Sequence, residues 1–578
     1  MHPRLLPYLT RHRRPLAVGV ACIALSRAVQ LVQPKVLELA VDGLSRGITA
    51  IKLGQYAVAY LAIAVLAGTF SYFMRQTVIA TSRRIEFDLR NDVFGHLMKL
   101  PASFFQARST GDLMARATSD VAAVRMMVGP GLMYLVNTFV GVVIAVGFML
   151  SISPRLTLYA VLPLPFISLT VWGFGGRIHR RFERIQRQFA AISSRVQENL
   201  SGVRVVRAFA REESEAAAFD RLNRDYVDHN LALIRTSGLF HPTLGFLSGL
   251  AALLGLYLGG REVIAGRITI GQFVAFTVYL GMLNWPVYAL GWVINLFQRG
   301  SASFQRLVEV LEIEPAIASP PHALAPVTCR GEVEVRDLHF TYPGATHPTL
   351  RGVSFHVPAG ATVALVGRTG AGKSTLLAML PRVFDPPPGT VLLDGVDVRD
   401  YDLAWLRRHV AYATQDHVLF SDTVANNLAY AVPDATRDEI ERVAARAQLD
   451  AEVRRFPRGY DTLVGERGIT LSGGQRQRAC IARALLQDTP VALFDDCLSS
   501  VDTHTEEGIL ASLRDHARGR TTILVSHRVS SVRDADLILV LEDGRIAERG
   551  HHDELVALGG TYAQLARAQQ LEAELEAS

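Results

Sequence analysis

The residues that could do chemistry begin with a glycine-rich stretch near the middle of the chain. It comprises Gly367, Arg368, Thr369, Gly370, Ala371, Gly372, Lys373 and Ser374, between an apolar run at 361–366 and a helix-forming run that starts at Thr375. Glycines in such a loop let the backbone direct its N–H groups at phosphate oxygens, the lysine neutralises phosphate charge, and the serine hydroxyl can bind Mg²⁺. The stretch predicts a nucleotide-binding site.

A second motif places an acid where the metal of that nucleotide would lie. Asp495 ends the apolar run 491–494, which is typical of a buried strand. Because the carboxyl ends of parallel strands meet at one edge of a sheet, Asp495 should lie beside the glycine-rich loop and share Mg²⁺ with Ser374. These two motifs predict a nucleotide site but leave open what the nucleotide drives.

A third motif, Leu471-Ser472-Gly473-Gly474-Gln475, precedes a helix-forming run that starts at Arg476. The N–H groups at the start of a helix bind anions. With this LSGGQ motif between the other two, the sequence resembles the ATP-binding cassette (ABC) family over nearly its whole length. The resemblance implies that the nucleotide is ATP, and that Ser472, Gly473, Gly474 and Gln475 are the family's signature residues.

The resemblance also implies roles for several smaller motifs. Tyr342 resembles the aromatic residue that stacks on adenine, Gln415 the metal-binding glutamine, and Gly465-Glu466-Arg467-Gly468 the exporter-specific X-loop. Ser499-Ser500-Val501-Asp502 resembles the D-loop, so Asp502 joins the candidate nucleotide-site residues. His527 follows another strand-like run, and its imidazole could hold the γ-phosphate and the attacking water.

One catalytic position departs from the family pattern. The residue after the first aspartate should be a glutamate that polarises the attacking water, and this chain has Asp496. Its side chain is shorter by one methylene, which retracts the carboxylate by about 1.5 Å, and a misplacement near 1 Å can cost about a hundredfold in rate. Slow hydrolysis at this site is therefore expected, unless the aspartate reaches the water through a second water or a small backbone shift.

The family resemblance further implies that two cassettes pair head to tail, so that this chain's signature faces the P-loop of a second half-transporter. An intact signature beside Asp496 is the combination found in one half of heterodimeric exporters, which predicts a partner chain with a catalytic glutamate. Two alternatives stay open. One is a homodimeric lipid flippase of the same family, and the other is a nucleotide-gated regulatory or channel subunit.

Composition separates the two halves of the chain. The 578 residues are 49% hydrophobic with a mean hydropathy of +0.21, and the apolar residues concentrate before residue 300. Six segments approach the length of about 20 apolar residues that spans a bilayer: 16–33, 56–80, 132–152, 156–176, 243–260 and 270–296. Counting the first as a retained helix rather than a signal peptide gives an even number.

Basic residues set the orientation of these spans. They gather in the stretches after the second and fourth segments and before the first, so these stretches and both termini are predicted to be cytoplasmic, in the inner (plasma) membrane. The net charge is +6, but the basic residues fall in loops between apolar runs rather than on one face of a soluble domain. This distribution disfavours a nucleic-acid partner. Helical apolar spacing continues into the polar stretches and predicts helices that extend well beyond the bilayer.

The predicted fold is an α-helical membrane bundle of six transmembrane helices followed by an α/β P-loop nucleotide-binding domain. A proline-rich run at 315–326 marks the junction. We expect a transmembrane domain at 1–314, a linker at 315–329, an ATP-binding domain at 330–570 and a tail at 571–578. Polar loops near 104–112 and 207–215 resemble the short helices that seat exporter transmembrane domains on their cassettes.

The transported substrate is predicted only by class. The apolar wall of the bundle favours hydrophobic or amphipathic molecules such as drugs, lipids or peptides, in contact with membrane lipids. Arg27 and Arg75 fall within apolar segments, where they could line a pathway or snorkel to an interface. Cys22, Cys329, Cys480 and Cys497 show no paired spacing, so neither disulfides nor a zinc site is expected.

Overall fold

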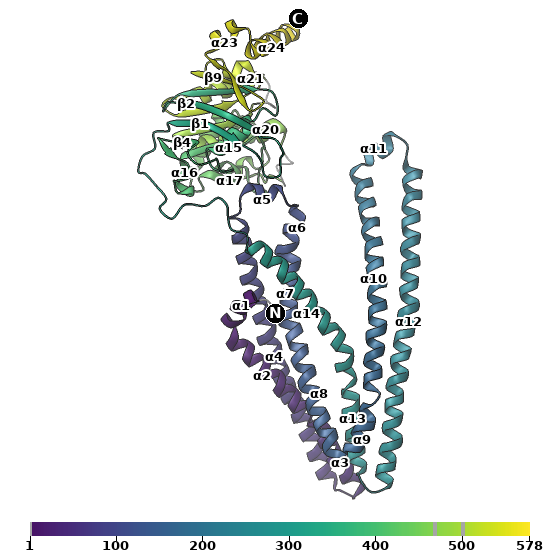
Figure 1. Cartoon of the computed structure of the whole chain (residues 1–578). Helices are drawn as coiled ribbons and strands as arrows, with labels where there is room; N and C mark the ends of the chain where they lie inside the picture. Colours follow the sequence, from purple (N-terminus) through teal and green to yellow (C-terminus); the bar gives the residue numbers. More distant parts are fainter. Residues whose placement is uncertain (1–2, 466–470, 499–502, 578) are drawn as a thin grey trace. The chain divides into compact units, whose positions relative to one another are not determined.

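The computed structural model describes residues 3–465, 471–498 and 503–577 (Figure 1). Contacts within the chain divide it into two units. One consists of Met1–Met98 with Thr110–Ile313, and the other of Lys99–Ser109 with Glu314–Ser578. The first unit is helical, and the second contains the β-sheets.

The first unit is built from long helices. In chain order they are η1 (Pro3–Leu5), α1 (Leu6–Arg11), α2 (Arg13–Gln30), α3 (Gln33–Ser45), α4 (Ala50–Leu97), α6 (Thr110–Ala115), η2 (Arg116–Asp120), α7 (Val121–Met126), η3 (Met127–Gly131), α8 (Leu132–Ile152), α9 (Pro154–Val161), α10 (Leu164–Ser201), α11 (Val203–Ala208), α12 (Glu212–Ile264), α13 (Ile270–Met282) and α14 (Asn284–Leu311). Consecutive helices form five segments long and apolar enough to cross a membrane, and these confirm the first five predicted spans: Arg13–Ser45, Ala50–Leu97, Thr110–Ile152, Pro154–Ser201 and Glu212–Ile264.

The sixth predicted span, 270–296, is wrong as a continuous helix. The chain forms the shorter apolar helix α13, breaks at Leu283, and continues as α14. Pro286 lies in the first turn of α14, where its missing N–H costs no hydrogen bond. A proline at this point would interrupt the ladder of one uninterrupted helix, which accounts for the division.

Three helices are far longer than a bilayer requires. The helices α4, α10 and α12 contain 48, 38 and 53 residues, and at 1.5 Å per residue α12 is about 80 Å long, against a hydrocarbon core of about 30 Å. The prediction that helices extend beyond the membrane is confirmed. Figure 1 shows α10 and α12 side by side, joined by the short helix α11.

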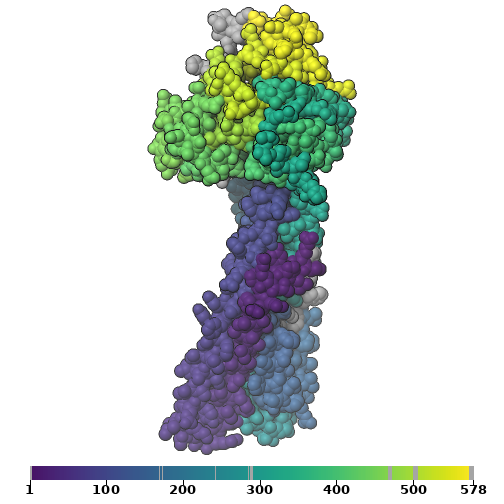
Figure 2. Space-filling model, turned by 90° about the vertical axis from the view of Figure 1, so that its left-hand side faces the viewer, coloured from purple at the N-terminus to yellow at the C-terminus, as the bar shows by residue number. Residues whose placement is uncertain are grey.

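Polar contacts tie the N-terminal segment and α7 to α4. The phenol of Tyr8 donates to Asp92 at 2.7 Å, and Arg11 and His12 contact Asp88, so the N-terminal segment is tied to α4. Figure 2 shows α1 and α2 in purple lying across α4. Deeper in the same unit the buried carboxylate of Glu86 contacts three guanidinium groups, those of Arg83, Arg90 and Arg125.

The two arginines in apolar segments differ in their surroundings. The guanidinium of Arg27 donates to the side chain of Asn137 on α8, and at 2.6 Å to Gln30. Arg75, on α4, is exposed. Arg27 is therefore held between helices by neutral amides rather than stretched toward an interface, whereas no such contact fixes Arg75 among the interactions described.

The second unit contains two sheets. The first is antiparallel, in the order β2-β1-β4-β5, and the second has the order β10-β9-β3-β8-β7-β6, with β9, β3, β8, β7 and β6 mutually parallel. The strands are β1 (Val333–Phe340), β2 (Leu350–Val357), β3 (Thr362–Gly367), β4 (Val391–Leu393), β5 (Val396–Asp397), β6 (Val410–Ala413), β7 (Val491–Asp495), β8 (Thr521–Val525), β9 (Leu537–Glu542) and β10 (Arg545–Gly550). Strand β7 is buried throughout, as expected for a central parallel strand.

Helices pack on both faces of the parallel sheet, which gives two hydrophobic cores. Ala364 and Phe494 face one core, and Val363 and Leu493 face the other, as the alternation of side chains along a strand requires. The helices of this unit are α5 (Ala102–Gln106), α15 (Lys373–Met379), α16 (Leu403–His409), α17 (Val424–Leu428), η4 (Ala429–Ala431), α18 (Arg437–Arg446), α19 (Asp450–Val453), η5 (Gly459–Asp461), α20 (Gly473–Leu486), α21 (Thr503–Ala517), α22 (Val529–Val532), α23 (His552–Leu558) and α24 (Thr561–Ala577).

Two connecting segments belong to this second unit by their contacts. The short helix α5 packs Ala102 against the core that includes β1 and β2, and Arg108 lies 4.5 Å over the ring of Phe104. In the proline-rich segment, Leu324 exchanges backbone hydrogen bonds with Asp400 and Asp402, each at 2.8 Å. The segment is thus extended along the cassette rather than helical.

Buried His516 on α21 gives this unit a pH-dependent stability. It is 1% exposed, and neither ring nitrogen has a hydrogen-bond partner in the described part of the chain. Burial, with Arg520 and Arg446 acting in the same direction, lowers the pKa of His516 from 6.5 to about 4. As the pH falls, His516 therefore takes up a proton in the unfolded state before it does so in the folded state. The stability that the neutral, buried imidazole allows is fully present above pH 6.5 and is lost as the pH falls toward 4.

We expect wild-type protein to lose thermal stability between pH 7.5 and pH 5 more steeply than the His516→Leu variant, by on the order of a few degrees in Tm. The leucine removes the titrating group and leaves an apolar side chain in a buried site. Scanning fluorimetry of the purified transporter at a series of pH values measures the difference. Parallel pH profiles of the two proteins would show that His516 does not carry this dependence.

Candidate functional site

The parallel sheet brings the predicted motifs to one edge. The glycine-rich loop leaves the end of β3, Asp495 ends β7, and His527 follows β8 by two residues. Strand β8 pairs with both neighbours, Leu365 with Val525 on one side and Asp495 with Val525 on the other. The glycine-rich loop therefore meets two motifs that lie more than a hundred residues further along the chain, at adjacent strand ends, where ligands bind in sheets of this kind.

The glycine-rich loop takes a backbone path that side chains would block. Gly372 has φ +99°, and a Cβ there would lie 2.8 Å from Leu350 Cδ2 and 3.1 Å from the carbonyl oxygen of Thr349. A Cβ at Gly367 would lie 2.3 Å from the carbonyl oxygen of Leu541. Gly372 also occupies the N-cap of α15 and offers no side-chain cap, so the first N–H groups of this helix are available to an anion.

Lys373 is held inside the loop by the loop's own carbonyls. Its ammonium donates to the backbone oxygens of Gly367 at 2.8 Å and Arg368 at 3.0 Å. The residue is 6% exposed, and this burial lowers the pKa of Lys373, while Asp496 and Asp495 act in the opposite direction. A buried cation at the start of the helix reinforces the attraction for phosphate that the N–H groups provide.

Asp495 and Ser374 form the pair that the sequence predicted. The serine hydroxyl donates to Asp495 Oδ1 at 2.9 Å, and the phenol of Tyr412 donates to Oδ2 at 3.2 Å. Burial raises the pKa of Asp495, and the hydrogen bonds from Ser374 and Tyr412 oppose that rise. Sequence reasoning missed Tyr412, although its place in β6, three residues before Gln415, is a usable signal.

These oxygens are chemically suited to Mg²⁺. A carboxylate and a hydroxyl 2.9 Å apart are hard ligands that can share one small divalent cation together with phosphate oxygens and water. Gln415 is exposed and lies two residues beyond the end of β6. It therefore follows the strand that pairs with β7, but no contact described here joins its amide to Ser374 or Asp495.

The backbone of Asp496 is fixed on two sides. Its N–H donates to the carbonyl of Val525 at 3.1 Å, and its carbonyl accepts from Gln477 Nε2 at 3.2 Å. Gln477 is fully buried on α20, so the acid is tied both to the strand before His527 and to the helix that follows the signature. Burial raises the pKa of the Asp496 carboxyl, against the fields of His527 and Lys373.

The signature motif begins helix α20 with reciprocal hydrogen bonds. Ser472 Oγ accepts from the N–H of Gln475 at 3.2 Å, and Gln475 Oε1 accepts from the N–H of Ser472 at 2.9 Å, which is a capping box. Ser472 and Gly473 are exposed, and a Cβ at Gly473 would meet nothing within 4 Å. The start of the helix therefore presents backbone N–H groups at the surface of the chain.

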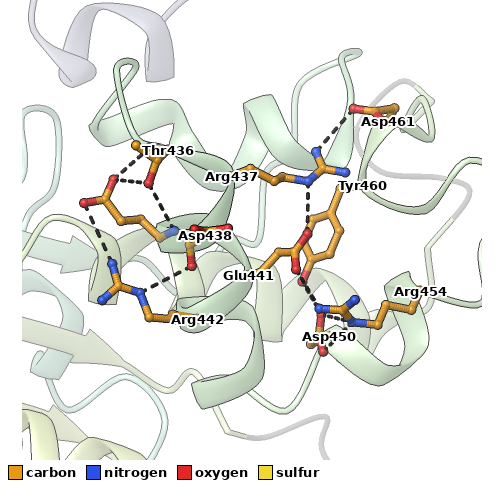
Figure 3. A network of polar contacts seen from close by, with 10 residues as sticks. Thr436, Arg437, Asp438, Glu441, Arg442, Asp450, Arg454, Tyr460 and Asp461 are labelled. Carbon is orange, nitrogen blue, oxygen red and sulfur yellow. Dashed lines mark hydrogen bonds and ion pairs between the residues drawn. The ribbon is translucent and has the colours of Figure 1, made fainter.

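A carboxylate outside the motifs fixes the direction of this helix. Glu452 on α19 accepts from Gln475 Nε2 at 2.7 Å and from Arg478 Nη2 at 2.5 Å. The position of α19 is set by the network in Figure 3, in which Arg454 and Tyr460 both donate to Asp450. Glu452 belongs to no sequence motif, and sequence reasoning missed it.

The remaining predicted residues lie near the same edge or outside the described residues. The phenol of Tyr342 is 2.8 Å from Thr375 Oγ1 on α15, and its ring packs edge-on against Phe340 and Phe384. Tyr342 therefore lies beside α15, the helix that follows the glycine-rich loop. The D-loop at 499–502, which includes Asp502, and residues 466–468 of the X-loop lie outside the described residues.

Comparison with known families identifies both units. Residues 16–287 match the family described as the ABC transporter transmembrane region, and residues 350–499 match the family described as ABC transporter. The chain is 37% identical over 558 residues to the probable multidrug resistance ABC transporter ATP-binding/permease protein YheI of Bacillus subtilis, covering 96% of this chain and 95% of that protein. It is 38% identical to the multidrug resistance-like ATP-binding protein MdlA of Escherichia coli, covering 98% and 96%.

Two further relatives extend the comparison. An ATP-dependent lipid A-core flippase of Aromatoleum aromaticum is 36% identical, covering 97% of this chain and 95% of that protein. The solved structure of a bacterial Atm1-family ABC exporter with ATP bound aligns with a TM-score of 0.80 at 30% identity, covering 96% of this chain and 98% of that one.

A helical transmembrane region and an ATP-binding cassette on one chain define an ATP-hydrolysing membrane transporter. The chain belongs to the ABC transporter family and has the fold of its exporters. It is a multi-pass inner-membrane protein with its ATP-binding domain in the cytoplasm. The sequence-based predictions of fold class, ATP hydrolysis and membrane location are confirmed.

We expect Lys373→Ala to reduce photolabelling of this chain by azido-ATP about tenfold or more, because the loop loses its buried cation. Lys52→Ala is the matched control, since Lys52 is an exposed lysine outside the cassette. Labelling is measured on the purified transporter, with each chain separated after crosslinking. Wild-type labelling of the Lys373→Ala chain would contradict a role for this lysine in nucleotide binding.

Proposed function

We propose that this chain is one half of a dimeric exporter of hydrophobic or amphipathic molecules, and that the ATP site at its own P-loop hydrolyses slowly. The observation that carries the proposal is an intact signature, Ser472 to Gln475, on the same chain as the shortened acid Asp496. The signature serves the partner's nucleotide, whereas Asp496 serves this chain's own. The partner is then a second half-transporter with a glutamate at the equivalent position.

The geometry of Asp496 supports slow hydrolysis at its own site. A small backbone shift could restore the reach that is lost with the missing methylene. Such a shift would break the hydrogen bond to Val525, the one from Gln477, or both. Breaking a buried hydrogen bond leaves polar groups unpaired at a cost of about 1–3 kcal/mol each. The carboxylate therefore stays retracted by about 1.5 Å from where a glutamate would place it.

In the proposed mechanism ATP lies across the P-loop. The amides from Gly367 to Thr375 and the ammonium of Lys373 bind its phosphates, and Tyr342 stacks on the adenine. Ser374, Asp495 and Gln415 would hold Mg²⁺, which would neutralise phosphate charge. Asp496 orients the attacking water and accepts its proton, and the imidazole of His527 donates to the γ-phosphate.

The second cassette completes each site. The exposed N–H groups at Ser472, Gly473 and Gly474 would bind the γ-phosphate of ATP held by the partner's P-loop, and Asp502 would lie at the same interface. Binding of two ATP molecules draws the cassettes together and drives the bundle from inward-facing to outward-facing. Hydrolysis resets it. The alternative within the family is a homodimer, in which two copies of Asp496 carry all hydrolysis.

Two short helices are proposed to transmit this motion. The helix α5 belongs by its contacts to the cassette of its own chain. The helix α11 belongs to the membrane unit and exposes Val205 by 61% and the adjoining Phe209 by 73%. Two large apolar side chains exposed on a polar helical loop are typical of a docking site, and we assign the partner's cassette as the surface that covers them.

Substrate class follows from the membrane helices and the relatives. Relatives bear the names of multidrug resistance proteins and of a lipid A-core flippase, and both kinds of molecule combine apolar and polar parts. In this chain the amide-bound Arg27 is a cationic group within a mainly apolar membrane-span segment. An amphipathic substrate suits such a lining better than a purely polar one.

We expect Gly473→Ala to abolish most ATPase activity of the transporter. The added methyl group meets nothing within 4 Å in this chain, so any loss reports on the nucleotide and partner that this surface faces. Gly95→Ala on α4, another glycine with open space around it, is the control and should keep wild-type turnover. Unchanged steady-state ATPase in Gly473→Ala would argue against head-to-tail pairing of the cassettes.

Two substitutions at position 496 separate the heterodimer from the homodimer. Asp496→Glu should raise total ATPase by about twofold at most, since a repaired site can only match the partner's competent one. Asp496→Asn should change total ATPase little, because the partner's glutamate carries most turnover. The measurement is steady-state ATPase of the purified transporter with each single substitution. Near-complete loss with Asp496→Asn would make Asp496 the main catalytic base and favour the homodimer.

A further inference from the structure

We propose that Gln569, on the C-terminal helix α24, is a positioning residue that holds the loop of His527 in its working geometry. A single side-chain amide bridges the two peptide groups on either side of Arg528. Gln569 Nε2 donates to the carbonyl of His527 at 2.6 Å, and Gln569 Oε1 accepts from the N–H of Val529 at 2.7 Å. The inference rests on the proposed role of His527 in binding the γ-phosphate.

The loop of His527 contains two backbone groups, the His527 carbonyl and the Val529 N–H, that this amide pairs. It joins β8 to α22, a helix of only four residues, and Val529 is the first residue of that helix. The first N–H groups of a helix have no partner within it. No side-chain cap is present at Arg528, so Gln569 supplies the acceptor for Val529 and at the same time the donor for His527.

Other contacts hold the side chains of the loop and the N–H of Arg528, but not the carbonyl of His527 or the N–H of Val529. Arg528 and Ser531 both contact the carboxylate of Glu506, which is 3% exposed on α21. Ser526 Oγ accepts from the N–H of Arg528 at 3.0 Å. Among the contacts described, those of the His527 carbonyl and the Val529 N–H are made by Gln569 on α24. Gln569 and Ser526 therefore hold opposite sides of the peptide after His527, and rotation of that peptide would move the imidazole.

The helix that carries Gln569 is firmly attached to the cassette. Tyr562 is fully buried, its phenol is 2.8 Å from His552 Nδ1, and the hydroxyl of Thr561 donates to Glu542 at 2.6 Å. Gln569 follows Tyr562 by two helical turns, about 11 Å at 1.5 Å per residue. Core packing thus fixes the start of α24, and the amide of Gln569 further along the helix reaches the loop of His527, which we call the switch loop.

Only an amide satisfies both peptide groups. A carboxylate at this position would accept from Val529 but would place a second acceptor against the carbonyl of His527, and a thioether would offer neither bond. Gln569→Glu therefore removes one hydrogen bond and adds a repulsion, whereas Gln569→Met removes both bonds at similar volume without adding charge. The two variants separate an effect of geometry from an effect of charge.

The test is the rate of ADP trapping with vanadate at this chain's own site, followed with azido-ATP and crosslinking in the purified transporter. We expect both Gln569 variants to lower this rate about three- to tenfold, while nucleotide labelling on ice without vanadate and the Tm stay at wild-type values. Gln564→Glu, an exposed glutamine on the same helix, is the control and should trap at the wild-type rate. Wild-type trapping by both Gln569 variants overturns the proposal, as does a loss accompanied by an equal loss of labelling or a lowered Tm.

A double-substitution cycle shows whether Gln569 acts through His527. In a His527→Ala background, Gln569→Met should produce no further decrease in the residual trapping rate, because the side chain that it positions is gone. An additional decrease of the same factor as in wild type overturns the proposal and leaves the role of His527 intact. If His527→Ala alone traps at the wild-type rate, the proposed function of His527 fails, and the positioning role fails with it.

Discussion

The backbone of Asp496 is the point on which the rest of the nucleotide site depends. One hydrogen bond joins it to Val525 at the end of β8, and another joins it to Gln477 on the signature helix. The acid, the switch loop and the signature are thereby connected through two peptide atoms of a single residue. A displacement of any one element reaches the other two, which suits the proposed pairing with a second cassette.

The signature helix illustrates how such positions are set from outside the motifs. Its first turn is capped by its own Ser472 and Gln475, which is a local device. Its direction, however, depends on Glu452, whose carboxylate contacts both Gln475 and Arg478. Glu452 lies on a four-residue helix that Asp450 ties to Arg454 and Tyr460 (Figure 3), so a peripheral ion network determines where the N–H groups of the signature point.

The sequence predicted the parts of this molecule that are encoded locally. The P-loop and the strand that ends in Asp495 follow from short-range patterns, and the long helices follow from continuous apolar spacing. The pair of Ser374 with Asp495, 121 positions apart, was predictable because parallel strands end at one edge of a sheet. Residues that act through long-range packing gave no such signal. Gln569 reaches His527 across 42 positions of chain, and Tyr412 reaches Asp495 across 83. The division at Leu283 was missed because the apolar run continues through it, and hydropathy does not register the backbone effect of Pro286.

The conformation of Asp496 gives a physical reason for the shortened acid. Its φ is +47°, in the left-handed region where aspartate is several-fold enriched among residues other than glycine. A short polar side chain can bond locally and tolerate this backbone, whereas a longer acid has less to offset the strain. A chain whose own site need not hydrolyse quickly can use the residue that fits this backbone best. In the proposed heterodimer, Asp496 would thus combine a shorter reach toward the water with a backbone that joins β8 to α20, and rapid turnover would fall to the glutamate proposed for the partner.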